Sequence, residues 1–249
     1  MTIVQQVLRS SLAAFLAIAC FGCNNNAPTT AATTDTMKTD AMKVDSAKPA
    51  AAAAMPVLAA PFDIAEVNET VKDYATWKPG YDTTASVRTA AGLDKLVLAQ
   101  VIDKPNMVQA VYKITDGKKV TDFFAKPEVK AIIQKAGVIG KSDIFLLHVI
   151  RFNPDSKEKQ WVEITHKVKN FDAWLKVYDE EGKEKRMAEG MVDVVLARGT
   201  LDSNIVHIVF DIKDMARAKA AIASEEKKKL MMSAGVIGIP KIVYYKEAE

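Results

Sequence analysis

The chain has 249 residues, of which 49% are hydrophobic and 26% charged, and its formal net charge is only +3. This composition is typical of a globular protein with one large domain or two small ones. Basic residues alternate with acidic ones, as in residues 180–186 and 224–229, so the sequence lacks the concentrated positive charge that binds phosphates. We therefore expect no nucleic-acid partner.

Residues 1–22 have the pattern of an export signal, with a cation at Arg9, an apolar stretch at 12–19 and small residues ahead of a cysteine. The apolar stretch is shorter than the roughly 20 residues that span a bilayer. The segment resembles a bacterial lipoprotein signal, which implies a lipid on the first mature cysteine. Cys23 is the predicted attachment site, because Gly22 precedes it and polar residues follow. Cys20 is the alternative attachment site. A second alternative is an ordinary export signal that is cleaved without attachment of a lipid.

The lipoprotein resemblance implies a protein anchored in the cell envelope through its lipid. Asn24, rather than an acidic residue, follows Cys23 and favours the outer membrane, facing the periplasm. Residues 23–61 consist mainly of Ala, Thr, Asp, Lys, Met and Pro without apolar periodicity, and we predict a disordered tether. Cys20 and Cys23 are the only cysteines, so the folded region has no thiol for a disulfide or a thiolate metal site.

The rest of the chain repeats itself at an offset of 97 to 98 residues. The sequence VKDYATWKPGYD at 71–82 matches VKNFDAWLKVYD at 168–179, and both copies contain AGVIG, at 136–140 and at 234–238. We therefore predict two copies of one unit, at 62–153 and 158–249.

Each copy begins with a strand of alternating residues, through 67–71 and 164–168. Asp73 and Asn170 are the predicted N-caps of the helices that follow. Each helix carries aromatic residues on one face, which must pack on a sheet: Tyr74, Trp77 and Tyr81 in the first copy, and Phe171, Trp174 and Tyr178 in the second.

Two strands come next in each copy, at 97–101 and 107–114 and at 194–198 and 205–212. Asp116 and Asp214 then begin a second helical region, which Pro127 and Ser224 restart. The last strands are expected at 142–152 and 240–246.

The repeated AGVIG segment is interpreted as the end of a helix. Gly137 and Gly235 would take the left-handed conformation after the last helical turn. Gly140 and Gly238 would then turn the chain into the final strand. The segment is not a phosphate-binding loop, because that pattern requires a glycine at Lys135 and a preceding strand.

The order strand, helix, strand, strand, helix, strand is that of a ferredoxin-like unit. On the aromatic helix, the AGVIG cap and this element order, residues 63–246 resemble a tandem version of the dimeric α+β barrel group, which includes antibiotic-biosynthesis monooxygenase-like proteins. The resemblance implies an α+β fold in which two ferredoxin-like βαββαβ units form one pseudo-dimeric barrel. It also implies that ligands or haem bind between sheet and helices. The protein would be a monomer, because its two halves pack together as the two subunits of a dimer do.

Two candidate pockets follow from strand parity and the aromatic helices. His166 would face Trp174 and Tyr178, while the first copy places Glu69 near its own aromatic pair, Trp77 and Tyr81. The alternatives are that His166 has its hydrogen bonds satisfied within the protein and that Glu69 is solvated or paired. The aromatic rings would then serve only as core.

Strand parity turns His207 away from His166, toward the side of Thr165 and Lys167. The chain also lacks the HExxH spacing, so we expect no metal.

The sequence contains no catalytic triad at a strand-to-helix turn and no dinucleotide loop. We therefore expect a lipid-anchored module that binds a small apolar or aromatic ligand or a partner, with no cofactor. The alternative, implied by the resemblance, is a cofactor-independent monooxygenase-like enzyme or a haem-degrading one, which would act through His166.

Overall fold

The computed structural model describes residues 61–248, so the predicted signal, most of the tether and Cys23 lie outside the described residues. The elements of the first half are β1 (Phe62–Val71), α2 (Tyr74–Thr83), α3 (Ala85–Ala90), β2 (Asp94–Val101), β3 (Lys104–Ile114), α4 (Gly117–Ala125), α5 (Pro127–Lys135) and β4 (Val138–Phe152). Those of the second half are β5 (Gln160–Val168), α6 (Phe171–Glu181), α7 (Lys183–Ala188), β6 (Met191–Gly199), β7 (Ile205–Ile212), α8 (Met215–Ala223), α9 (Glu225–Ser233) and β8 (Val236–Glu247).

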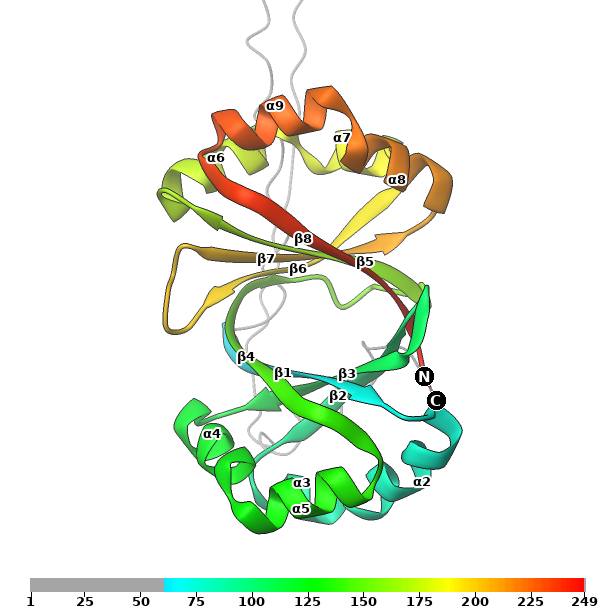
Figure 1. Cartoon of the computed structure of the whole chain (residues 1–249). Helices are drawn as coiled ribbons and strands as arrows, with labels where there is room; N and C mark the ends of the chain where they lie inside the picture. Colours follow the sequence, from blue (N-terminus) through cyan, green and yellow to red (C-terminus); the bar gives the residue numbers. More distant parts are fainter. Residues whose placement is uncertain (1–60, 249) are drawn as a thin grey trace, which may run out of the picture.

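The eight strands form one closed barrel in the order β1-β3-β2-β8-β5-β7-β6-β4. Two antiparallel seams join the halves, β2 with β8 and β4 with β6. In Figure 1, α2 to α5 cover one side of the barrel and α6 to α9 the opposite side. The predicted fold, two tandem ferredoxin-like units sharing one α+β barrel, is confirmed.

The predicted helix starts are also confirmed. Asp73, Asp116, Asn170 and Asp214 each accept a hydrogen bond from the backbone N–H three residues later, at 2.8 to 3.0 Å. Such caps typically stabilise a helix by about 1 kcal/mol. The second helical regions restart as expected, with Pro127 as the first residue of α5 and the Ser224 side chain capping α9.

The AGVIG segments do end helices, with Gly137 at φ 105° and Gly235 at φ 82°. Gly140 and Gly238 also have positive φ, but the prediction that they turn the chain ahead of the last strand is wrong. They lie inside β4 and β8, near the points where pairing with β1 and β5 shifts register. A glycine in this conformation accommodates the extra residues of a β-bulge without a steric penalty.

Strand alternation divides the apolar side chains into three cores. In the first half, one core lies around Trp77, between the barrel wall and the helices. In the second half, a matching core lies around Trp174. The third lies inside the barrel and takes residues from both halves, including Trp161 and Tyr245. Among the described helices, none has the length and apolar character needed to cross a bilayer.

Candidate functional site

The predicted pocket of the second half lies between the barrel wall and the helices α6 to α9. The space between its lining atoms is about 610 Å³, part of it open to solvent. His166, Trp174 and Tyr178 all line it, together with apolar residues of β6, β7, β8 and α9. Concave, largely apolar sites with a few convergent polar groups are typical of small-molecule binding.

His166 is the main polar group on the floor of this pocket. Its side chain is buried, and neither Nδ1 nor Nε2 has a hydrogen-bond partner within residues 61–248. Burial, with a smaller contribution from the charge of His207, lowers the pKa of His166 to about 4. The imidazole is therefore neutral at pH 7, with one free donor and one free acceptor.

Aromatic rings form one wall of the same pocket. The Trp174 ring lies 5.6 Å from that of His166 at 59°, and it stacks on Tyr178 with a centroid distance of 5.1 Å. The guanidinium of Arg186 lies 3.9 Å from the centroid of the Tyr178 ring. Because Trp174 and Tyr178 are themselves buried, these rings serve both as core and as pocket wall.

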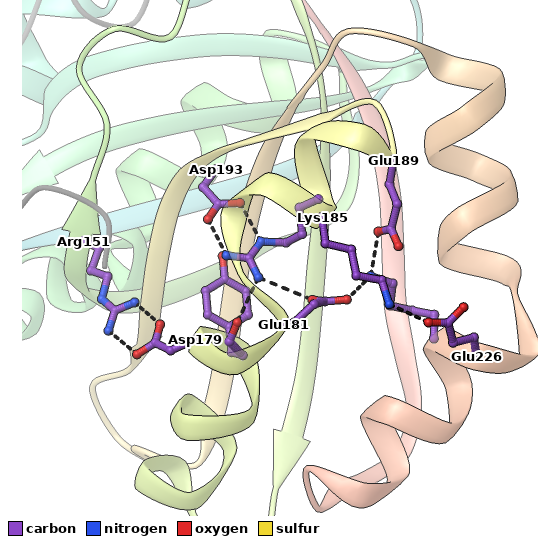
Figure 2. A network of polar contacts seen from close by, with 10 residues as sticks. Arg151, Asp179, Glu181, Lys185, Glu189, Asp193 and Glu226 are labelled. Atoms are coloured by element: carbon purple, nitrogen blue, oxygen red, sulfur yellow. Dashed lines mark hydrogen bonds and ion pairs between the residues drawn. The ribbon is translucent and has the colours of Figure 1, made fainter. Parts of the chain in front are cut away.

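The cations beside the pocket are engaged with carboxylates. Arg186 donates to both oxygens of Asp193 at 2.8 and 2.6 Å and contacts Glu181 at 3.4 Å. Lys227 pairs with Glu181 and, at 2.7 Å, with Glu189. Figure 2 shows this network extending from α6 and α7 to α9, where Lys185 reaches Glu226. The network ties α9 across the side of the pocket.

The pocket of the first half has a similar size, about 600 Å³, but different chemistry. Glu69, Trp77 and Tyr81 line it together with Tyr112. The Tyr81 and Tyr112 hydroxyls lie 2.9 Å apart, and Ser142 donates to Glu69 at 2.5 Å. Burial raises the pKa of Glu69, although the Ser142 hydrogen bond and the charge of Arg88 oppose the shift. Its carboxylate is thus partnered, unlike the imidazole of His166.

A third group of polar residues, which the sequence analysis did not identify, lies inside the barrel. Glu66 on β1, Glu163 on β5 and His207 on β7 are each at most 7% exposed. His207 Nε2 lies 3.0 Å from Glu66 Oε1, and Gln109 Nε2 donates to Glu163 Oε2 at 2.8 Å. Strand parity does turn His207 away from His166, as predicted, and this is what points it into the barrel.

The pKa values inside the barrel reflect close contact between carboxylates and an imidazole. Burial lowers the pKa of His207, but the charge of Glu66, the close contact with its carboxylate and the charge of Glu163 together outweigh this effect and raise the pKa to about 9. Burial, followed by the charge of Glu66, raises the pKa of Glu163. One signal in the sequence could have revealed this cluster, since Glu66 and Glu163 occupy equivalent positions of the two copies, 163 − 66 = 97 residues apart.

No family model matches the sequence, and no curated protein matches it. Among solved structures, a candidate monooxygenase of Fusobacterium nucleatum subsp. nucleatum is similar at 13% identity and a TM-score of 0.51, covering 77% of this chain and 94% of its own. An anthrone oxidase-like protein has 12% identity and a TM-score of 0.49, with coverage of 76% and 92%. A haem-binding protein of Thermus thermophilus has 13% identity and a TM-score of 0.48, with the same coverage. At such identities the likeness concerns the fold alone.

Proposed function

We propose that this protein binds a small, flat and largely apolar ligand in the pocket of the second half, with His166 as its polar anchor. The observation that carries the proposal is the pair of His166 nitrogens that have no hydrogen-bond partner within residues 61–248, in a buried, apolar and aromatic pocket. Buried polar groups nearly always have a hydrogen-bond partner, so an orphan facing a cavity indicates a group that a ligand satisfies. Trp174 offers the ligand a ring to stack on.

The charges beside the pocket favour a neutral ligand. Two cations, Arg186 and Lys227, contact three carboxylates, those of Glu181, Glu189 and Asp193. An anionic ligand would have to displace one of these carboxylates to gain a cation as partner. Without that exchange, the cost of removing the ligand's charge from water would be poorly compensated. A phenol, an alcohol or a ketone on an aromatic ring fits the imidazole better.

Haem fits this pocket only in part. A neutral, unpartnered imidazole such as that of His166 suits an axial ligand of haem iron. The two carboxylates of haem, however, would meet cations that are already neutralised by Glu181, Glu189 and Asp193. The residues present therefore do not fit haem well, and we assign no step to it.

Binding of 1-naphthol and of naphthalene to the purified full chain, measured by calorimetry, tests the proposal. We expect 1-naphthol to bind about 5- to 10-fold more tightly, because a hydrogen bond to His166 contributes about 1 kcal/mol. His166→Phe should retain naphthalene and lose the preference for the alcohol. Glu69→Gln, the matched variant in the other pocket, should leave the preference unchanged. Equal preference in wild type and His166→Phe would refute the proposal.

The same neutral imidazole favours a second candidate function, cofactor-independent oxidation of a bound phenol or quinol. His166 would accept a hydrogen bond from the phenol and hold its oxygen in place while the ring reacts with oxygen, since a buried imidazole with a pKa of about 4 is a weak base. Oxygen uptake with a naphthalene diol as substrate tests it. Turnover that disappears in His166→Phe would identify an enzyme, whereas binding without oxygen uptake would leave the binding module.

We further propose that the folded region is attached to the envelope through a lipid on Cys23, on the strength of the sequence pattern around it. Cys23→Ser should move the protein from the membrane fraction to the soluble one, while Cys20→Ser should leave it membrane-bound. The reverse result would assign the lipid to Cys20, and no release in either variant would argue against a lipid anchor.

A further inference from the structure

We propose that the barrel interior binds one divalent transition-metal cation, held by His207 Nε2 and one carboxylate oxygen each from Glu66 and Glu163. These three donor atoms lie within 4.8 Å of one another. Donors that bind one cation at about 2.0–2.2 Å are roughly 3–4 Å apart, so small side-chain movements would complete the site. One imidazole with two carboxylates suits Zn²⁺, Mn²⁺ or Fe²⁺.

The closed barrel is what creates the site. β1 and β5 are four positions apart in the ring of eight strands, on opposite sides of the barrel, and so are β3 and β7. The equivalent glutamates of the two copies, Glu66 and Glu163, therefore approach each other across the interior. Two buried carboxylates repel each other and are costly to desolvate. A divalent cation would neutralise both charges, and the imidazole of His207 would release its proton on binding and add a third ligand.

Hydrogen bonds around the cluster orient its ligands as metal sites require. Thr165 Oγ1 lies 2.9 Å from His207 Nδ1, which leaves Nε2 directed toward the glutamates. Trp161 Nε1 and Gln109 Nε2 donate to the two oxygens of Glu163, at 3.3 and 2.8 Å. His207 and Glu163 thus each have a fixed outer partner.

Two buried atoms at the cluster lack a hydrogen-bond partner within the described range. His207 Nε2 is close to Glu66, but the contact does not have hydrogen-bond geometry, and Gln109 Oε1 accepts from no donor. Both side chains are at most 2% exposed. A cation would engage the first atom, and a water on that cation could donate to the second.

Space for that water and for access adjoins the cluster. A pocket of about 370 Å³, part of it open to solvent, is lined by all three proposed ligands together with Asn68, Thr165 and Lys241. A second, apolar cavity of about 500 Å³ reaches Glu66 and Glu163 from the other side. Coordination positions that the protein leaves open would therefore face room for water or a small oxygen-donor ligand.

Titration of the full chain with Co²⁺ tests the proposal, with visible absorption bands as the readout and elemental analysis of the isolated protein beside it. We expect one equivalent to bind and the temperature of unfolding to rise with its concentration. Glu163→Gln and His207→Gln should weaken binding by at least about 100-fold, and Thr165→Val by about 10-fold, as for an outer partner.

His148→Gln is the matched control, since His148 Nδ1 also contacts a carboxylate, Asp63 Oδ1 at 2.7 Å, but these side chains are 37% and 39% exposed and belong to no group of three possible ligands within residues 61–248. It should bind Co²⁺ as wild type does. If His207→Gln does not fold, Thr165→Val and the stoichiometry of the wild type decide. Folded wild type that binds no Co²⁺ at about 1 mM, or undiminished binding in Glu163→Gln, would overturn the proposal.

Discussion

Replacing His166 by phenylalanine removes a group whose pKa falls from 6.5 to about 4 when the chain folds. The unfolded chain binds a proton below pH 6.5, whereas the folded protein resists protonation until about pH 4. The wild type must therefore lose stability as the pH falls through this window, and the variant must lose less. A shift of one pKa unit corresponds to about 1.4 kcal/mol.

The two pKa values set the size of the effect. Wild type should lose about 2 kcal/mol relative to His166→Phe between pH 7.5 and pH 5, and about 3 kcal/mol by pH 4. Urea unfolding followed by circular dichroism at several pH values measures the difference. Comparing the two proteins at each pH cancels the titration of all other groups, provided that both unfold in two states.

Glu69→Gln provides a control of opposite sign. Because burial raises the pKa of Glu69, the folded wild type resists loss of this proton, and its stability relative to Glu69→Gln should fall as the pH rises above 4.5.

Parallel pH profiles for wild type and His166→Phe would refute the reasoning. They would mean that the imidazole of His166 is solvated or partnered in the folded protein.

Two further predictions concern the stability of the second half. Lys227→Met leaves the buried carboxylate of Glu181 poorly compensated and should cost about 3 kcal/mol in urea unfolding, whereas Lys185→Met, at an exposed pair, should cost less than about 1 kcal/mol. Equal losses of unfolding free energy in the two variants would show that the buried ion pair contributes no more to stability than the exposed one. A Cβ added to Gly190 would lie 2.8 Å from a backbone oxygen, but at Gly92, the equivalent position with the same positive φ, it meets nothing closer than 3.8 Å. Gly190→Ala should therefore lower the melting temperature by several degrees more than Gly92→Ala, and similar losses would contradict this steric argument.

The comparison of sequence and structure separates two kinds of information about the site. Local patterns predicted what depends on neighbours along the chain: the cap at Asn170, the aromatic face with Trp174, and the side of the strand on which His166 lies. These follow from the periods of strands and helices and from the needs of unpaired backbone N–H groups. The position of Gly140 within a strand was missed, since a bulge is defined by the register of a partner strand.

The sequence by itself determined that the protein is a duplicated βαββαβ chain, and which side chains of each strand face the helices. Only the tertiary structure decided that Glu66, Glu163 and His207 meet inside the barrel, because their strands come from opposite walls and from both copies. Likewise, only the packed structure shows that, among the described residues, His166 has no hydrogen-bond partner while Glu69 has one. Partnership and burial depend on contacts between residues far apart in the chain, which periodicity along one strand does not encode.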